Sequence, residues 1–109
     1  MAYGASKAAI IKITKDFARA LAPEARVNAI APGVVATPWA GLGQKERLAA
    51  SGDCALLKRL ATPQEIAELI VYLGMAGSFI TGQTVVIDGG LTLAEAREYA
   101  MAAQMNKAL

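Results

Sequence analysis

Tyr3 and Lys7 are the residues of this sequence whose types and spacing could do acid–base chemistry. The stretch Tyr3-Gly-Ala-Ser-Lys7 places them four positions apart, so on a helix the two side chains share one face, about one turn from each other. A phenol ionises only near pH ~10, and a nearby ammonium favours the charged phenolate. The pair could therefore move a proton at a substrate oxygen. Taken alone, the spacing is more simply explained by a half-buried tyrosine beside a solvated lysine.

The composition removes other common kinds of catalytic site. The 109 residues contain no histidine and one cysteine, Cys54. Ser-His-Asp and Cys-His catalysis, an internal disulfide and a cysteine-rich zinc site are therefore excluded, and we expect no metal site. Cys54 has no histidine or cationic neighbour to activate it, so we interpret it as a small buried hydrophobe.

Charge and hydropathy narrow the possible partners. The formal net charge is +2, and acids and bases are interleaved, so no basic stripe indicates nucleic acid. No apolar run reaches the ~20 residues that span a bilayer, and the first residues lack a signal-peptide pattern. We expect a cytoplasmic protein with neither a nucleic-acid nor a membrane partner.

The elements that must position these residues begin with a helix and a strand. Polar and apolar residues alternate at helical spacing from Ser6 to Leu21, which predicts an amphipathic helix that Pro23 ends. Its apolar stripe consists of Ile10, Ile13, Phe17 and Leu21. The segment Arg26–Ala31 is apolar on both faces apart from Asn28, as expected for a parallel strand covered on both sides.

Residues 40–61 have no strong single period. Glycines separate two predicted short helical pieces, one around Gln44–Ala50 and one around Cys54–Leu60. The apolar residues of this region could form a lid over an apolar substrate pocket, or they could belong to a poorly packed loop.

The stretch Thr62-Pro63-Gln64-Glu65 is the clearest local signal. It combines a threonine N-cap, a proline at the first helical position and a glutamate that completes a capping box. We expect the helix that follows to end at Gly74 or Gly77, and a second strand to run from Phe79 to Ile87. Strand, helix and strand would form one right-handed βαβ unit with two parallel strands, which indicates an α/β fold.

The C-terminal stretch begins with a second capping-box pattern, Thr92-Leu-Ala-Glu95. It predicts a helix that runs toward Leu109. The simplest interpretation is an ordinary amphipathic helix, since nothing in this segment indicates chemistry.

Several motifs occur together and in order along the chain. They are Tyr3-x-x-Ser6-Lys7-Ala8-Ala9, Arg26-Val-Asn-Ala-Ile-Ala-Pro-Gly33, Thr37-Pro38, Pro63-x-Glu65-Ile-Ala67, Thr81-Gly-Gln and Asp88-Gly-Gly90. This set resembles the C-terminal half of the short-chain dehydrogenase/reductase family. The resemblance implies a partial Rossmann-type fold that binds NAD or NADP, with hydride transfer between nicotinamide and a carbonyl or alcohol.

The resemblance also implies roles for particular residues. Tyr3 would give or take the hydroxyl proton. Lys7 would bind the nicotinamide ribose and help the phenol to ionise. Pro32, Val35 and Thr37 would line the nicotinamide and diphosphate region, although Thr37 by itself is more simply a turn hydroxyl.

The same resemblance divides the chain into regions. Residues 1–91 would form the C-terminal half of a Rossmann-type domain, with residues 38–61 as its substrate loop or lid. Residues 92–109 would be a C-terminal helical extension.

Parts of the family pattern have no counterpart in these residues. The glycine-rich turn, the catalytic serine and the internal asparagine of the family all lie upstream of its Tyr-x-x-x-Lys pair. We therefore expect little or no activity, and at best millimolar NAD(P)H affinity, from this chain alone. A homodimer, a higher homo-oligomer or a complementing N-terminal half would be its partner, and a small carbonyl or alcohol its substrate. The alternative is a non-catalytic α/β association module derived from the family.

Overall fold

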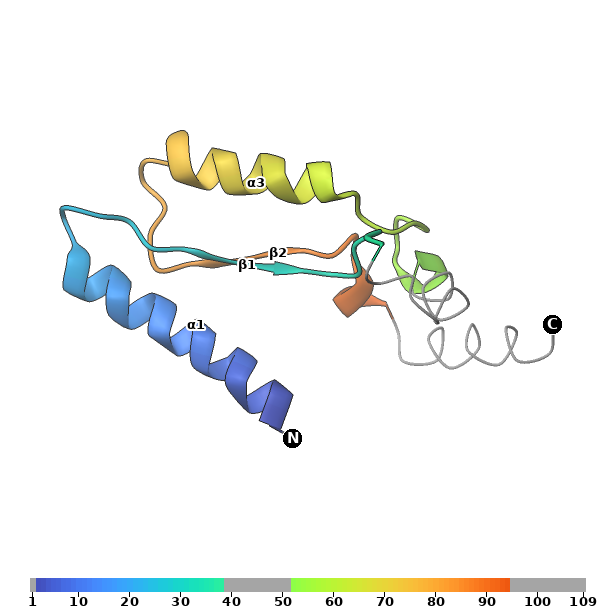
Figure 1. The fold of residues 1–109 in the computed structure, drawn as a ribbon, viewed down its shortest axis with the longest axis horizontal. Helices are drawn as coiled ribbons and strands as arrows, with labels where there is room; N and C mark the ends of the chain where they lie inside the picture. Colours follow the sequence, from blue (N-terminus) through green and yellow to red (C-terminus); the bar gives the residue numbers. More distant parts are fainter. Residues whose placement is uncertain (1, 39–51, 95–109) are drawn as a thin grey trace. The chain divides into compact units, whose positions relative to one another are not determined.

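A computed structural model describes residues 2–38 and 52–94. Its elements follow in the order α1 (Ala2–Leu21), β1 (Ala29–Pro32), α3 (Pro63–Met75), β2 (Thr84–Ile87) and η1, a short 3-10 helix (Leu91–Leu93), as Figure 1 shows. β1 and β2 form a two-stranded sheet. The predicted α/β fold with two parallel strands is confirmed.

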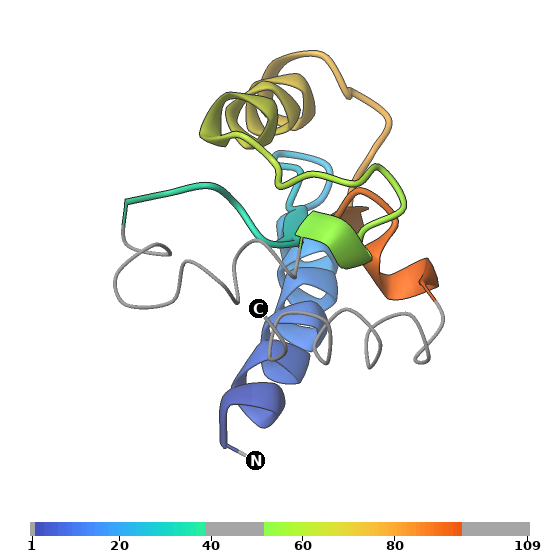
Figure 2. The same ribbon diagram turned by 90° about the vertical axis from the view of Figure 1, so that its right-hand side faces the viewer.

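The chain divides into two compact units. Unit 1 comprises Met1–Ala31 and Glu68–Val86, and unit 2 comprises Pro32–Ala67 and Ile87–Leu109. Within unit 1, the strands lie between α1 and the C-terminal part of α3 (Figure 1; Figure 2). This is the layered arrangement expected for a parallel pair of strands joined by a helix.

Helix α1 has the predicted amphipathic pattern and includes Tyr3, because it begins at Ala2. Within α1, Thr14 and Ala18 are buried. The predicted apolar stripe remains partly in solvent, with exposed fractions of 47% for Ile10, 48% for Ile13, 54% for Phe17 and 43% for Leu21. The helix therefore presents an apolar face that unit 1 does not cover.

Both strands are shorter than the sequence predicts. β1 covers Ala29–Pro32 rather than Arg26–Ala31, and β2 covers Thr84–Ile87 rather than Phe79–Ile87. The amides of Ala29 and Gly33 donate to the carbonyls of Gln83 (2.8 Å) and Ile87 (3.0 Å). The two strands are thus paired in the same parallel register at both of their ends.

Side-chain hydrogen bonds add to the backbone bond between Gly82 and Val27 where the predicted strands are missing. The Arg26 guanidinium donates to the carbonyls of Gly77 at 2.7 Å and Ile80 at 3.1 Å. The Asn28 amide donates to the carbonyl of Ile80 at 2.8 Å and accepts from the Gln83 amide at 3.1 Å. Because these side chains hold the turn before β2, the backbone there curves away from strand geometry.

The capping box of α3 is confirmed. The Glu65 amide donates to the Thr62 hydroxyl at 3.2 Å, and the Thr62 amide donates to the Glu65 carboxylate at 2.8 Å. The helix ends at Met75, between the two glycines that the sequence marks as possible ends. The Arg26 guanidinium also donates to the carbonyl of Gly74 at 3.1 Å, which places a cation at the negative end of the helix dipole.

Two predicted helix starts are corrected. The helical turn before α3 covers residues 52–54 and is followed by turns, so the piece predicted around Cys54–Leu60 is wrong. Gly52 lies inside this turn rather than breaking it. Thr92 lies within η1 and Ala94 is extended (φ −66°, ψ 138°), so Thr92 is not the N-cap of a following helix.

Some sequence predictions fall outside the described residues. The piece around Gln44–Ala50 does so, and so do Glu95 and the rest of the helix predicted toward Leu109. Among the described residues, Cys54 is 2% exposed, which confirms its interpretation as a buried side chain.

Candidate active site

The Tyr3 and Lys7 side chains lie together on the first turns of α1. The Lys7 ammonium is 5.3 Å from the centroid of the Tyr3 ring, within the range of a cation–π contact. Tyr3 is 76% exposed, and the Ser6 hydroxyl donates to the Tyr3 backbone carbonyl at 2.7 Å. The predicted shared face is confirmed, and the phenol is open to an incoming molecule.

Pro32 is the last residue of β1, and Val35 and Thr37 follow it; we call residues 32–37 the 32–37 loop. The Thr37 amide donates to the Val35 carbonyl at 2.9 Å, a tight turn that brings the two residues together. The structure thus groups Tyr3 with Lys7 in unit 1 and groups Pro32, Val35 and Thr37 in unit 2.

Backbone hydrogen bonds tie the 32–37 loop to the stretch before α3. The Ala36 amide donates to the Ala61 carbonyl at 2.8 Å, and the Ala61 amide donates to the Val34 carbonyl at 3.1 Å. Val35 and Ala61 accordingly form an isolated parallel bridge. The loop is therefore held by main-chain bonds at the residues that flank Val35.

Gly33 fixes the other side of this loop by close packing. A Cβ at this position would lie 2.8 Å from the Asp88 Cα and 2.9 Å from the Asp88 Cβ. Real Cβ atoms essentially never come so close to another carbon, so residue 33 has room only for a hydrogen. The approach lets the end of β1 pack directly on the end of β2.

Asp88 organises the turn that closes β2. Its carboxylate accepts hydrogen bonds from the amides of Gly90 and Thr92, each at 2.9 Å, and from the Thr92 hydroxyl at 2.7 Å. The Thr92 amide is the main reason that the pKa of Asp88 lies below its usual value. The sequence shows Asp88 only as the end of a strand, so its role as an acceptor was not predicted.

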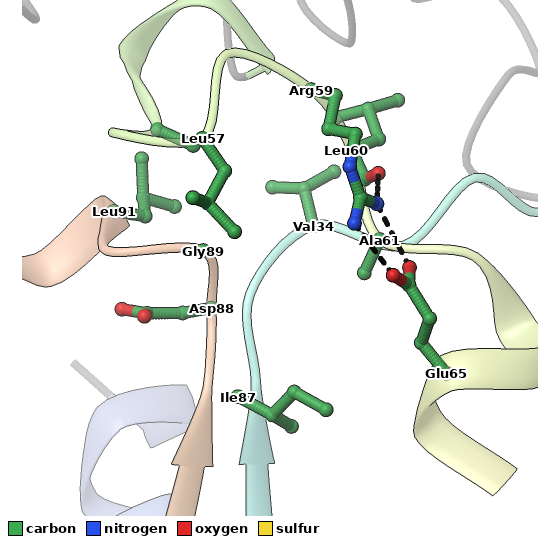
Figure 3. Close-up of a pocket in the computed structure, with 11 residues that line it drawn as sticks. Val34, Leu57, Arg59, Leu60, Ala61, Glu65, Ile87, Asp88, Gly89 and Leu91 are labelled. Atoms are coloured by element: carbon green, nitrogen blue, oxygen red, sulfur yellow. Dashed lines mark hydrogen bonds and ion pairs between the residues drawn. The ribbon is translucent and has the colours of Figure 1, made fainter. Parts of the chain in front are cut away.

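Arg59 and Glu65 form a two-pronged ion pair in the same unit (Figure 3). The guanidinium Nη2 donates to Oε1 at 2.6 Å and Nη1 donates to Oε2 at 2.9 Å. The Arg59 guanidinium and then the Thr62 amide lower the pKa of Glu65 to about 2. The sequence predicts Glu65 as a capping residue but gives no signal for Arg59, because this pair has no regular helical or strand spacing.

A small cavity lies beside this ion pair. Its volume is about 90 Å³, and Figure 3 shows apolar side chains from the end of each strand and from the stretch before α3 around it. They include Val34, Leu57, Leu60, Ile87 and Leu91. Ligand pockets usually measure ~300–1,000 Å³, so this cavity is too small for a dinucleotide.

Two other kinds of site receive no support from the described residues. Within residues 2–38 and 52–94, no group of three or more His, Cys, Asp or Glu side chains could hold a metal ion. In the same ranges, no helix is both long and apolar enough to cross a membrane.

Comparison with known proteins identifies the family. The sequence profile described as enoyl-(acyl carrier protein) reductase matches residues 1–92. The short-chain dehydrogenase/reductase homolog YusR of Bacillus subtilis is 43% identical over 93 residues, which cover 85% of this chain and 70% of YusR. The chain belongs to the short-chain dehydrogenase/reductase family. The family resemblance stated from the motifs is thereby confirmed.

Other family members are longer than this chain. The 7alpha-hydroxysteroid dehydrogenase of Bacteroides fragilis is 43% identical over 95 residues, or 84% of this chain and 36% of that enzyme. The structure of a 4-hydroxyisoleucine dehydrogenase complexed with NADH superposes with a TM-score of 0.75 at 36% identity, covering 86% of this chain and 40% of that one. The chain thus spans less than half the length of both enzymes.

Proposed function

We propose that this chain supplies the proton-transfer and nicotinamide-binding residues of an NAD(P)-dependent oxidoreductase acting on a small carbonyl or alcohol. The observation that carries the proposal is the exposed Tyr3 phenol with the Lys7 ammonium 5.3 Å from its ring. Family membership supports the nicotinamide cofactor, and a similar family structure holds NADH. Neither distinguishes NAD from NADP.

Tyr3 is proposed to move the proton and Lys7 to hold the ribose. A bound nicotinamide supplies the hydride that adds to the carbonyl carbon. The Tyr3 hydroxyl donates its proton to the carbonyl oxygen as the alcohol forms, and it accepts that proton in the reverse direction. The Lys7 ammonium donates hydrogen bonds to ribose hydroxyls and stabilises the phenolate left behind.

Pro32, Val35 and Thr37 are proposed to line the nicotinamide and diphosphate region. The 32–37 loop begins at the carboxyl end of β1, and ligands of open parallel sheets bind beyond that end. In this proposal residues 1–91 are the C-terminal half of a Rossmann-type domain, residues 38–61 its substrate loop and residues 92–109 an extension.

The exposed stripe of α1 favours association as a second property. Ile10, Ile13, Phe17 and Leu21 are about half exposed, and a two-stranded sheet is too small to be stable without cover. We propose that the stripe packs against a second copy of the chain, since two-fold dimers are the commonest closed assembly. A complementing N-terminal half is the other candidate partner, and without that half the chain would bind NAD(P)H only in the millimolar range.

Replacement of one hydroxyl tests the proposed chemistry. Tyr3→Phe should lower nicotinamide-dependent turnover by about 10²- to 10⁴-fold, because it removes the group that transfers the proton. Turnover is followed by nicotinamide absorbance, with this chain mixed with a complementing N-terminal half of a family member and a panel of small ketones, aldehydes and alcohols. Circular dichroism should show an unchanged fold, because Tyr3 is exposed.

Tyr72→Phe is the matched control for this experiment. It deletes a phenol hydroxyl from an exposed position on α3, so turnover should stay within about twofold of the wild type. Equal turnover for wild type and Tyr3→Phe would refute the assignment of Tyr3. Absence of nicotinamide-dependent turnover with every substrate would favour the association module instead.

A further inference from the structure

We propose that Arg59 and Glu65 are positioning residues that set the geometry of the 32–37 loop and thereby the affinity for the nicotinamide cofactor. The inference rests on the proposed function, since it takes this loop as part of the cofactor site. All of the residues involved lie in unit 2.

The ion pair bonds Arg59 to Glu65 at the start of α3, a connection that the capping box alone does not make. Glu65 Oε2 accepts from Arg59 Nη1 at 2.9 Å, from the Thr62 amide at 2.8 Å and from the Thr62 hydroxyl at 3.1 Å. Arg59 Nη1 also donates to the Leu60 carbonyl at 3.1 Å. The start of α3 is thereby bonded to the residues on both sides of Ala61.

Ala61 transmits this constraint to the loop. Its carbonyl accepts from the Ala36 amide and its amide donates to the Val34 carbonyl, so the position of Ala61 sets the position of the peptide groups around Val35. A guanidinium–carboxylate fork constrains direction as well as distance, because both prongs must be satisfied together. Loss of the fork should therefore loosen the loop without removing any atom that touches the cofactor.

Two substitutions separate the fork from the helix cap. Glutamine also completes a capping box, so Glu65→Gln keeps the bond to the Thr62 amide while it removes the charge that holds Arg59. Arg59→Met removes the fork and leaves the cap intact, whereas Arg59→Lys keeps a cation without the fork. A loop held through the helix cap and a loop held through the fork thus predict different outcomes for the same set of variants.

The kinetic test compares these variants of the chain, each mixed with the complementing N-terminal half. Arg59→Met should raise KM for NADH or NADPH about two- to fivefold, the range expected for breaking an exposed ion pair, with kcat and the KM for the carbonyl substrate within error. Arg59→Lys should restore part of the change. The double variant Arg59→Met/Glu65→Gln should be no worse than Arg59→Met alone, because both substitutions break one interaction.

Lys12→Met provides the control for loss of a surface cation. Lys12 is bonded to Asp16 in an exposed ion pair on α1, which belongs to unit 1. KM for the cofactor should stay at the wild-type value.

Amide hydrogen exchange without cofactor tests the coupling independently of activity. In Arg59→Met, the Ala36 and Ala61 amides should exchange two- to fivefold faster, which is about the factor by which KM rises. The Gly82 amide, which donates to the Val27 carbonyl at 2.7 Å in unit 1, should exchange at the wild-type rate.

The two readouts distinguish the ways in which the inference could fail. Unchanged exchange at Ala36 and Ala61 would overturn it, and so would faster exchange with an unchanged cofactor KM. If the wild type binds no nicotinamide cofactor while exchange still accelerates, the proposed function is refuted and the link between Arg59 and the loop stands.

Discussion

The first turns of α1 and the 32–37 loop hold their proposed site residues in different ways. Tyr3 and Lys7 owe their arrangement to helix geometry alone: Tyr3 is exposed, and a Cβ added at Gly4 would meet nothing within 4 Å. The 32–37 loop instead depends on contacts between segments distant in sequence. Its backbone bonds to Ala61, and Gly33 packs against Asp88.

Because of this difference, the residues proposed for proton transfer and the loop proposed to position the cofactor should respond differently to substitution. A pair set by helical spacing tolerates change around it, because its geometry survives as long as the helix does. A loop held by close packing and backbone bonds transmits small shifts to every residue it carries. We therefore expect substitutions near Tyr3 to cause no loss of stability, and substitutions around the loop to lower stability and cofactor affinity together.

Alanine at Gly33 and at Gly4 gives the largest stability contrast. Gly33→Ala should destabilise the fold by about 1–3 kcal/mol, because its methyl group would overlap Asp88. Gly4→Ala should stabilise it by about 0.5–1 kcal/mol, since Gly4 lies in a helix with open space beside it. Urea unfolding followed by circular dichroism measures both, and equal effects of the two substitutions would remove the contrast.

The exposed face of α1 provides the next test, because the chain does not hold that face by its own packing. Phe17→Lys should weaken self-association about fivefold or more, since an interface residue that loses its burial and gains a charge costs over ~1 kcal/mol. Analytical ultracentrifugation at micromolar concentration measures the change. Met75→Lys, an exposed apolar position outside the stripe, is the control. A compact wild-type monomer would contradict the proposed dimer.

The smallest expected effect concerns the charge on Glu65. Its pKa is about 2 in the folded chain and 4.5 ordinarily, so the carboxylate stabilises the fold above pH ~5 and loses this contribution as the pH falls toward ~2. Glu65→Gln should therefore lower the melting temperature at pH 7, and the difference from wild type should shrink on acidification. A difference as large at pH 2.5 as at pH 7 would mean that the fork is not electrostatic.

The features predicted correctly from sequence are those set by local spacing. The shared face of Tyr3 and Lys7 follows from one helical turn, and the capping box of Thr62 and Glu65 needs only neighbouring residues. The α/β fold follows from the order of a strand, a capped helix and a second strand.

The features that sequence reasoning missed depend on contacts between distant segments. β-branched and apolar residues predicted longer strands, but the side chains of Arg26 and Asn28 bind the turn before β2 and end the ladder. The fit of Gly33 against Asp88 joins the ends of two strands. The ion pair of Arg59 with Glu65 was not predicted, because nothing in the spacing of the two residues indicates it.

An NMR titration of the isotopically labelled chain with NADH and with NADPH tests the central claim most directly, because it detects millimolar binding. We predict that the amide signals of Lys7, Val35 and Thr37 shift together with one dissociation constant, while those of Tyr72 and Gly77 stay in place. Lys7→Met should weaken this binding about tenfold, and Lys15→Met should leave it unchanged. Shifts confined to other residues, or no shifts at 10 mM cofactor, would contradict the proposed nicotinamide site.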